Sequence, residues 1–138
     1  MCRATITDSA MSDLRALPSQ QLQRVALQWV RRLESTPKLG PELVWRWGQD
    51  LRGCRKDYFD AADAPLESDF VGRRRSEEGA GARYRIVYRL LPSEHEPAIV
   101  QVFAIGPKYS DRGGVYATAA ERYRLLLEEP EERERPAQ

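Results

Sequence analysis

Apolar and polar residues alternate in three stretches of the chain, and this period of two predicts three β-strands. The stretches are CRKDYF at 54–59, YRIVYRLL at 84–91 and AIVQVFAIG at 98–106. A shorter β-branched stretch, RATIT at 3–7, predicts one more strand near the start of the chain. The polar segment PSEHEP joins the second and third stretches, so we expect these two strands to form an antiparallel hairpin.

Helical periodicity occupies the chain between the first two strands and again at its end. Asp8 or Ser9 can cap a first helix that runs towards Leu17. Pro18 suits the first turn of a second helix, where its missing N–H is not needed. One face of that second helix is apolar, with Leu22, Val25, Ala26, Trp29, Val30 and Leu33. The segment STPKLGPEL ends it, and VYATAAERYRLLLEE predicts a last helix.

The two faces of the strand at 84–91 differ in chemistry. Tyr84, Ile86 and Tyr88 point one way and should pack under the helical hairpin, whereas Arg85 and Arg89 occupy the other face. That second face can stay partly open, as antiparallel sheets allow. The predicted fold class is therefore α+β: a small, mostly antiparallel sheet packed against an N-terminal helical hairpin, with a C-terminal helix.

Composition narrows the class of protein. A chain of 138 residues suggests one domain, which we place at 1–128, with a long loop insertion at 60–82 rich in Ala, Gly and charged residues. Residues 129–138 belong to an acidic tail that should be disordered. The net charge of +1 indicates no polyanion-binding field over the whole molecule. Because the last eleven residues hold five Glu and two Arg, the remainder is mildly basic.

The sequence gives little support for a metal site, a disulfide scaffold or a membrane-spanning segment. Cys2 and Cys54 are far apart and form no CxxC pair, and the single histidine, His95, lies in a polar turn that should be solvated. No apolar run reaches the length of a signal peptide or of a membrane helix. The expected setting is a reduced cytoplasmic compartment, with no metal and no cofactor.

Four segments together resemble the RelE/ParE toxins of bacterial toxin–antitoxin systems: DLRGCRKDYF, YRIVYRLLP, VFAIGPK and VYATAAERY. They span residues 50–123, and the upstream strand and helical hairpin agree in position and length. The resemblance implies a metal-independent endoribonuclease that cleaves mRNA, typically within the ribosome. In that chemistry the RNA 2′-hydroxyl attacks its own adjacent phosphate, so the site must move protons and stabilise charge on phosphorus.

The resemblance also implies roles for individual residues. Lys56 would act as base or charge stabiliser, Arg85 as a phosphate clamp, Lys108 as acid or clamp, and Tyr116 as a group that stacks or assists at the scissile nucleotide. Tyr58 occupies the position of a second lysine of the RelE pattern, and Lys108 the position of an arginine. Residues expected to contact RNA beside these four are Arg52, Arg55, Tyr58 and Arg89.

Each of these assignments has a plainer alternative. Arg85 and Arg89 could be solvated charges on an open sheet face, and Tyr116 could be a packing tyrosine on the apolar face of the last helix. Lys56 could belong to an exposed cluster of ion pairs. The loop residues Arg73, Arg74 and Arg75 could be solvated or could contact an RNA backbone, and Trp45 and Trp47 could pack or stack on bases.

Two other functions remain open alongside the nuclease. A ParE-like protein would inhibit DNA gyrase without needing the cationic residues, and a degenerate module of the same fold would bind without catalysis. In the toxin interpretation, the partners are mRNA, the ribosome and a small acidic antitoxin. The antitoxin would cover apolar side chains left exposed on the helices, for which Trp29, Val30 and residues 125–127 are the candidates.

Overall fold

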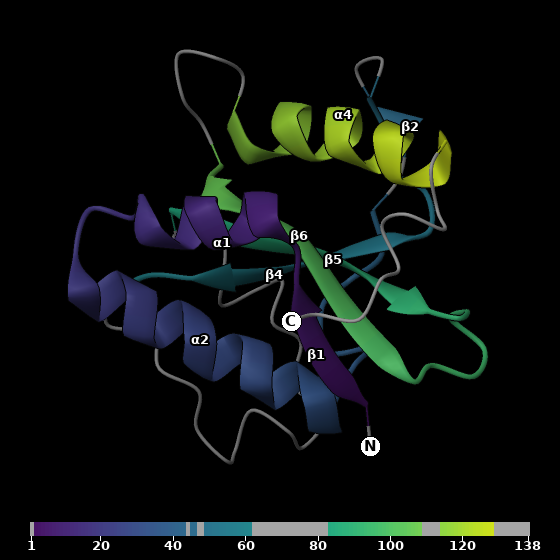
Figure 1. Ribbon diagram of the computed structural model, residues 1–138, viewed down its shortest axis with the longest axis horizontal. Helices are drawn as coiled ribbons and strands as arrows, with labels where there is room; N and C mark the ends of the chain where they lie inside the picture. The colour runs from purple at the N-terminus through teal and green to yellow at the C-terminus, as the bar shows by residue number, and fades with distance from the viewer. Residues whose placement is uncertain (1, 44, 47–48, 62–82, 109–113, 129–138) are drawn as a thin grey trace.

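The computed structural model describes residues 2–43, 45–46, 49–61, 83–108 and 114–128. In chain order these form β1 (Arg3–Ile6), α1 (Asp8–Arg15), α2 (Gln20–Ser35), β2 (Trp45–Arg46), β3 (Gln49–Asp50), β4 (Cys54–Phe59), β5 (Tyr84–Leu91), β6 (Ile99–Pro107) and α4 (Gly114–Glu128). The predicted α+β class is confirmed: two N-terminal helices, a mostly antiparallel sheet and a C-terminal helix packed on that sheet (Figure 1). Most of the predicted insertion and the predicted tail lie outside the described residues.

The main sheet has four strands in the order β1-β6-β5-β4. β1 runs parallel to β6, while β6, β5 and β4 form an antiparallel meander. Val87 pairs with Ala104 and Tyr88 with Val102, so Phe103 is an extra residue in β6 and forms a β-bulge. β2 and β3 make a separate two-stranded hairpin, which the alternation in the sequence did not predict.

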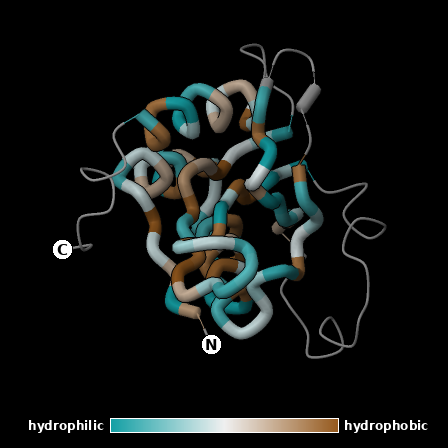
Figure 2. The backbone as a smooth tube through the Cα atoms, turned by 90° about the vertical axis from the view of Figure 1, so that its right-hand side faces the viewer, coloured by the Kyte–Doolittle hydropathy of each residue, from teal (hydrophilic) through white to brown (hydrophobic). Residues whose placement is uncertain are grey.

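α1 and α2 cover one face of the sheet. Thr7 caps α1 by accepting from the Ala10 amide at 3.2 Å, and Ser19 caps α2 by accepting from the Leu22 amide at 3.1 Å. The predicted caps at Asp8 or Ser9 and the predicted start at Pro18 were therefore wrong by one or two residues. The predicted apolar stripe of α2 is buried in full, together with Tyr84, Ile86, Tyr88 and Leu90 of β5. In Figure 2, many of the hydrophobic, brown segments of the tube lie towards the middle of the molecule.

The burial of α2 removes most of the expected docking surface for a partner. Trp29 and Val30 are 0% and 4% exposed, so neither can offer an apolar surface to a second protein. On α4, Leu126 is buried and Leu127 is 57% exposed. Within the residues that the structure describes, Leu127 is the one large apolar side chain that is exposed.

The other face of the sheet is covered in large part by α4. α4 packs there against Val87, Phe103 and Ala104, and Leu51 and Cys54 complete a second apolar core. β5 is consequently buried on both faces from Tyr84 to Leu90. The second face was expected to stay partly open: the final helix covers β5 there, while Lys56 of β4 is partly exposed.

The segment 40–43 runs along the outer edge of β4 and fixes its orientation. The Lys56 amide donates to the Pro41 carbonyl at 3.2 Å, and the Leu43 amide donates to the Cys54 carbonyl at 2.9 Å. Gly40 fits only because it lacks a side chain, since a Cβ there would lie 2.0 Å from the Lys56 carbonyl oxygen. The Cys54 carbonyl and the Lys56 amide therefore point away from β5. Residues 54, 56 and 58 are consequently in non-hydrogen-bonded pairs with β5, in which facing side chains are closest.

Asp60 and Arg83 form an ion pair where β4 ends and β5 begins. The Asp60 carboxylate accepts from the Arg83 guanidinium at 3.0 and 3.1 Å and from the Arg83 amide at 3.1 Å. The side-chain hydrogen bond from Arg83 lowers the pKa of Asp60 to about 2. This pair ties the two strands together at the end that carries Tyr58 and Arg85.

We expect Asp60→Asn to remove a pH-dependent part of the stability. Because the folded protein lowers the pKa of Asp60, the pair stabilises at pH above about 4 and its contribution disappears as the pH falls towards 2. Arg83 is 69% exposed, so the effect at neutral pH should be about 1 kcal/mol or less. Urea unfolding of both proteins from pH 7 to pH 2 measures it, and a difference that is unchanged at pH 2 would contradict the assignment.

Among the described segments, no helix is both long enough and apolar enough to cross a bilayer.

Candidate functional site

Four of the sequence-predicted residues meet on the α4 face, at one end of the β4–β5–β6 meander. Tyr58 pairs directly with Arg85, and Arg85 pairs with Gly106 on its other side. Lys56 lies two residues before Tyr58 and so shares its face of β4. Tyr116 approaches from the first turn of α4. Lys56, Tyr58 and Arg85 lie close together because β4 and β5 are adjacent and because side chains alternate between the two faces of a strand.

Arg85 is the buried member of this cluster. It is 1% exposed, its Nη1 donates to the carbonyl oxygen of the preceding residue, Tyr84, at 2.9 Å, and its guanidinium carbon lies 4.3 Å from the centroid of the Tyr58 ring. The guanidinium therefore lies over an aromatic face, where the ring quadrupole favours a cation. The alternative that Arg85 and Arg89 are solvated charges is wrong, because Arg89 is only 7% exposed.

Lys56 lies near two aromatic rings. Its Nζ is 5.4 Å from the centroid of the Tyr58 ring and 5.5 Å from that of the Tyr116 ring. Unlike Arg85, Lys56 is partly exposed, so its ammonium can reach a ligand in solvent. The rings of Tyr58 and Tyr116 thus lie beside the positive charge of Lys56 at the surface. A second positive charge, that of Arg85, lies over the Tyr58 ring.

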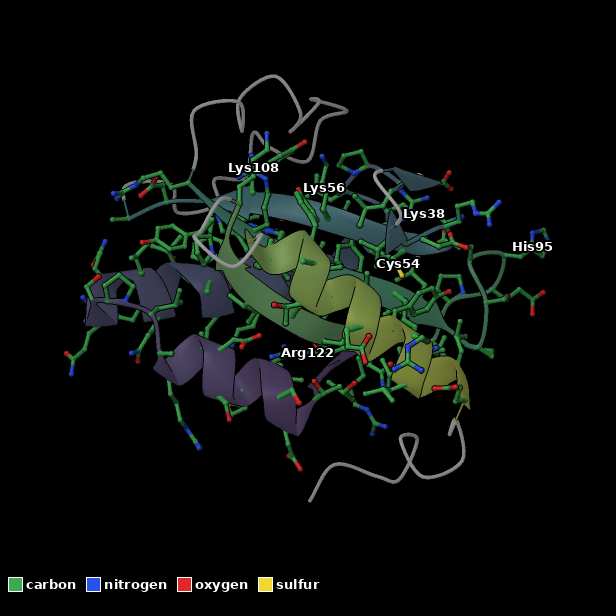
Figure 3. The ribbon with its side chains drawn as sticks, turned by 90° about the horizontal axis from the view of Figure 1, so that it is seen from above. Lys38, Cys54, Lys56, His95, Lys108 and Arg122 are labelled. Carbon is green, nitrogen blue, oxygen red and sulfur yellow. The ribbon has the colours of Figure 1, made fainter. Side chains whose placement is uncertain are left out.

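The start of α4 brings Tyr116 and Lys108 to the same end of the molecule. Gly114 begins the helix at a φ of +78°, and a Cβ on it would lie 2.2 Å from the Lys108 carbonyl oxygen. A glycine is required by both the close approach and the left-handed backbone. The Lys108 amide donates to the Arg83 carbonyl at 2.9 Å. Figure 3 shows Lys108 and Lys56 along the upper edge of the view, near its middle, whereas the exposed His95 lies at the far right.

Tyr116 and Lys108 differ in how they can serve a ligand. Tyr116 is partly exposed and packs against the second core, and its hydroxyl oxygen is buried, so the ring rather than the hydroxyl faces Lys56. Lys108 is partly exposed and follows β6 directly. Lys108 stands two residues after Gly106, which is the partner of Arg85 in β6.

Arg55 lies away from this cluster, on the opposite face of β4. Its Nε and Nη2 donate to the Glu94 carboxylate at 2.9 to 3.2 Å, its Nη2 also donates to Glu42 at 3.1 Å, and its Nη1 donates to the Gly40 carbonyl at 2.8 Å. These bonds occupy the guanidinium and hold the loop at 40–42 and the β5–β6 turn against β4. The geometry gives Arg55 a structural role instead of the predicted contact with RNA.

Arg52 and Arg89 make their contacts with other parts of the fold. Arg52 forms a bidentate pair with Asp50 at 2.7 and 2.8 Å, which lowers the pKa of Asp50 to about 2. Arg89 lies beneath the C-terminal half of α4, where its Nε donates to Gln101 at 2.7 Å and its guanidinium carbon is 6.0 Å from the Tyr123 ring. Neither residue joins the cluster around Tyr58.

Groups that could hold a metal or act as a nucleophile are sparse in the described ranges. Cys54 is fully buried, and desolvation raises the pKa of its thiol to about 12, so it stays protonated and unreactive at neutral pH. No three His, Cys, Asp or Glu side chains gather as a candidate metal site in the part of the chain that the structure describes. The chemistry available at the cluster is that of ammonium, guanidinium and phenol groups.

Two features of the site were missed from the sequence. The first is the burial of Arg85, which needed the position of α4. The second is the role of Tyr58, expected to contact RNA yet only 6% exposed and packed between two cations. The alternation in CRKDYF does contain the second signal, because it places residues 56 and 58 on one face and Arg55 on the other.

Comparison with known proteins identifies no relative: no family model, no curated protein and no solved structure matches the chain.

Proposed function

We propose that the protein is a metal-independent endoribonuclease that cleaves mRNA, of the kind that the resemblance to RelE/ParE toxins implies. The observation that carries the proposal is the Lys56 ammonium, partly exposed beside the rings of Tyr58 and Tyr116 and backed by Arg85. A cationic surface flanked by aromatic rings suits a nucleotide, since the cation attracts the phosphate and a ring can stack on a base.

The proposed reaction divides the work among the exposed and buried groups. The RNA 2′-hydroxyl attacks the adjacent phosphorus, the bond to the 5′-oxygen breaks, and a 2′,3′-cyclic phosphate and a 5′-hydroxyl are formed. Lys56 takes up the 2′-proton or stabilises the charge on phosphorus, and Lys108 donates a proton to the leaving oxygen. Arg85, at 1% exposure, adds positive potential from behind rather than binding the phosphate directly.

The burial of Arg85 also favours a second candidate, a non-catalytic binding module of the same fold. A guanidinium that donates to the Tyr84 carbonyl and lies on the Tyr58 ring is not presented to a substrate as a phosphate clamp. In that case Lys56 and Lys108 would bind an anionic partner without cleaving it. The two candidates make opposite predictions for RNA in a purified system.

The setting of the proposed nuclease is the cytoplasm, with mRNA, the ribosome and an antitoxin as partners. The described surface offers Leu127 and little else that is large and apolar. An antitoxin would therefore depend on charge complementarity more than on a large apolar footprint. An acidic segment bound over Lys56 and Lys108 would compete with RNA directly.

The deciding experiment incubates the purified full chain with a synthetic mRNA in EDTA, and in a second mixture with ribosomes in the Mg²⁺ buffer that keeps them intact. We expect fragments that end in a 2′,3′-cyclic phosphate and begin with a 5′-hydroxyl. A gyrase supercoiling assay is run in parallel. Retention of RNA without cleavage in both mixtures would overturn the nuclease and support the binding module, and inhibition of supercoiling would support the gyrase alternative.

A further inference from the structure

The ring of Tyr58 lies close to both the Lys56 ammonium and the Arg85 guanidinium. The Lys56 Nζ lies 5.4 Å from its ring centroid and the Arg85 guanidinium carbon 4.3 Å. The two cations are therefore no more than 9.7 Å apart, the total of those two distances. Like charges this close repel each other, and burial weakens the screening that water would give.

The backbone register explains why Tyr58 can reach both cations. Tyr58 faces Arg85 directly across the β4–β5 ladder. Since the Lys56 amide bonds outward to Pro41, positions 56 and 58 form the closely spaced, non-hydrogen-bonded pairs with β5. Lys56 and Tyr58 are two residues apart and share one face. One ring is thus adjacent to a cation on its own strand and to a cation on the neighbouring strand.

We propose that Tyr58 is a positioning residue, whose ring holds the Lys56 ammonium and the Arg85 guanidinium together at the cluster. The negative face of an aromatic ring attracts a cation, so a shared ring offsets part of the repulsion between the two charges. The hydroxyl group of Tyr58 should contribute little to this attraction, because the guanidinium lies over the face of the ring. This role rests on the proposed function only where it concerns RNA cleavage.

The position of the Tyr58 ring also has a consequence for the rate of RNA cleavage. With the ring in place, Lys56 is held at the surface next to Tyr116, where it can meet a phosphate. Without the ring, Lys56 keeps its reach but gains conformational freedom, and Arg85 loses the surface on which it lies. The rate of the chemical step should fall more than the affinity for RNA, because a correctly placed charge is used most fully in the transition state.

The first arm of the test is spectroscopic and independent of RNA. The chain has three lysines, so carbon-13 labelling of lysine gives three ε-methylene signals, and Lys38 in an exposed loop is the internal reference. We expect the Lys56 signal to be shifted upfield of the Lys38 signal by the ring currents of Tyr58 and Tyr116. Tyr58→Phe should keep that shift, whereas Tyr58→Leu should lose a large part of it.

The second arm measures RNA cleavage by the same variants. Tyr58→Phe should stay within about twofold of the wild type, and Tyr58→Leu should lower kcat roughly tenfold with little change in KM. Tyr58→Met serves where the leucine variant folds poorly, because its flexible side chain fills irregular space without an aromatic face.

The outcomes distinguish the positioning role of Tyr58 from the proposed nuclease function. An unchanged Lys56 signal in a folded Tyr58→Leu or Tyr58→Met variant overturns the positioning role, as does a wild-type kcat in either. Loss of activity in Tyr58→Phe also overturns it, because that would make the hydroxyl the working group. If the wild type cleaves no RNA, the proposed function fails, and the lysine signal alone decides whether Tyr58 holds Lys56.

Discussion

Replacing Lys56 with alanine should lower the rate of RNA cleavage by a factor of about 100 to 1,000, the usual loss when one preorganised donor to a transition-state charge is removed. Lys56 is partly exposed beside two aromatic rings, and it is the member of the cluster that can meet the phosphate. The fold should be unaffected, since the side chain belongs to neither apolar core. Single-turnover cleavage of a synthetic mRNA, together with thermal unfolding, measures both effects.

The chain supplies its own control for that substitution. Lys38 is exposed in the loop after α2, and Lys38→Ala removes the same charge from another part of the surface. It should leave cleavage within about twofold of the wild type, because Lys38 belongs to the loop after α2 and its exposed charge is screened by solvent and salt. Equal losses in the two variants would mean that lysine contributes through overall charge and not through a site at Tyr58.

A second substitution at the same position separates the two roles considered for Lys56. Arginine stays protonated at any relevant pH, so Lys56→Arg keeps the charge and removes the possibility of a base. Substantial activity in Lys56→Arg would assign charge stabilisation to Lys56. Activity as low as that of Lys56→Ala would assign proton transfer to it.

Local pattern was enough to predict the strands of the meander. Alternation of apolar and polar residues placed β4 and β5 at their observed bounds, and the apolar stripe of α2 is buried as expected. Such signals are local, because each strand or helix must bury one face wherever it packs. For the same reason the hairpin of β5 and β6 followed from one polar turn.

The candidate site could be predicted only in part, since burial depends on contacts between distant segments. Arg85 was placed on the correct face of β5, but the sequence did not reveal that α4 returns over that face and leaves Arg85 buried. Arg55 adjoins Lys56 in sequence and was grouped with it. The alternation that puts Lys56 beside Tyr58 turns Arg55 to the other side, where Glu94 and Glu42 bind it.

One ion pair that joins three segments helps to anchor α4, in addition to the apolar contacts of this helix. Asp13 of α1 accepts from the Arg122 guanidinium of α4 at 2.5 and 3.1 Å, and the same carboxylate accepts from the Ile105 amide at 3.0 Å. Arg122 also donates to the Phe103 carbonyl at 2.9 Å. The two side chains thus satisfy backbone groups at the β-bulge of β6 while they tie α1 to α4. Because α4 carries Tyr116, this pair supports the candidate site from a distance.

We therefore expect Asp13→Ala to destabilise the protein by about 2–3 kcal/mol, which corresponds to a fall of roughly 6–12 °C in Tm. The substitution leaves the Ile105 amide without its acceptor and Arg122, at 24% exposure, without its carboxylate. Asp8→Ala on the same helix is the matched control: Asp8 is exposed in the first turn, and its loss should cost about 0.5 kcal/mol. Thermal unfolding of Asp13→Ala, Arg122→Ala and the double variant gives the coupling energy between the two side chains. Additive losses, or a Tm for Asp13→Ala equal to that of Asp8→Ala, would show that the ion pair does not anchor α4, and the position of Tyr116 would then have to depend on the apolar contacts of α4 alone.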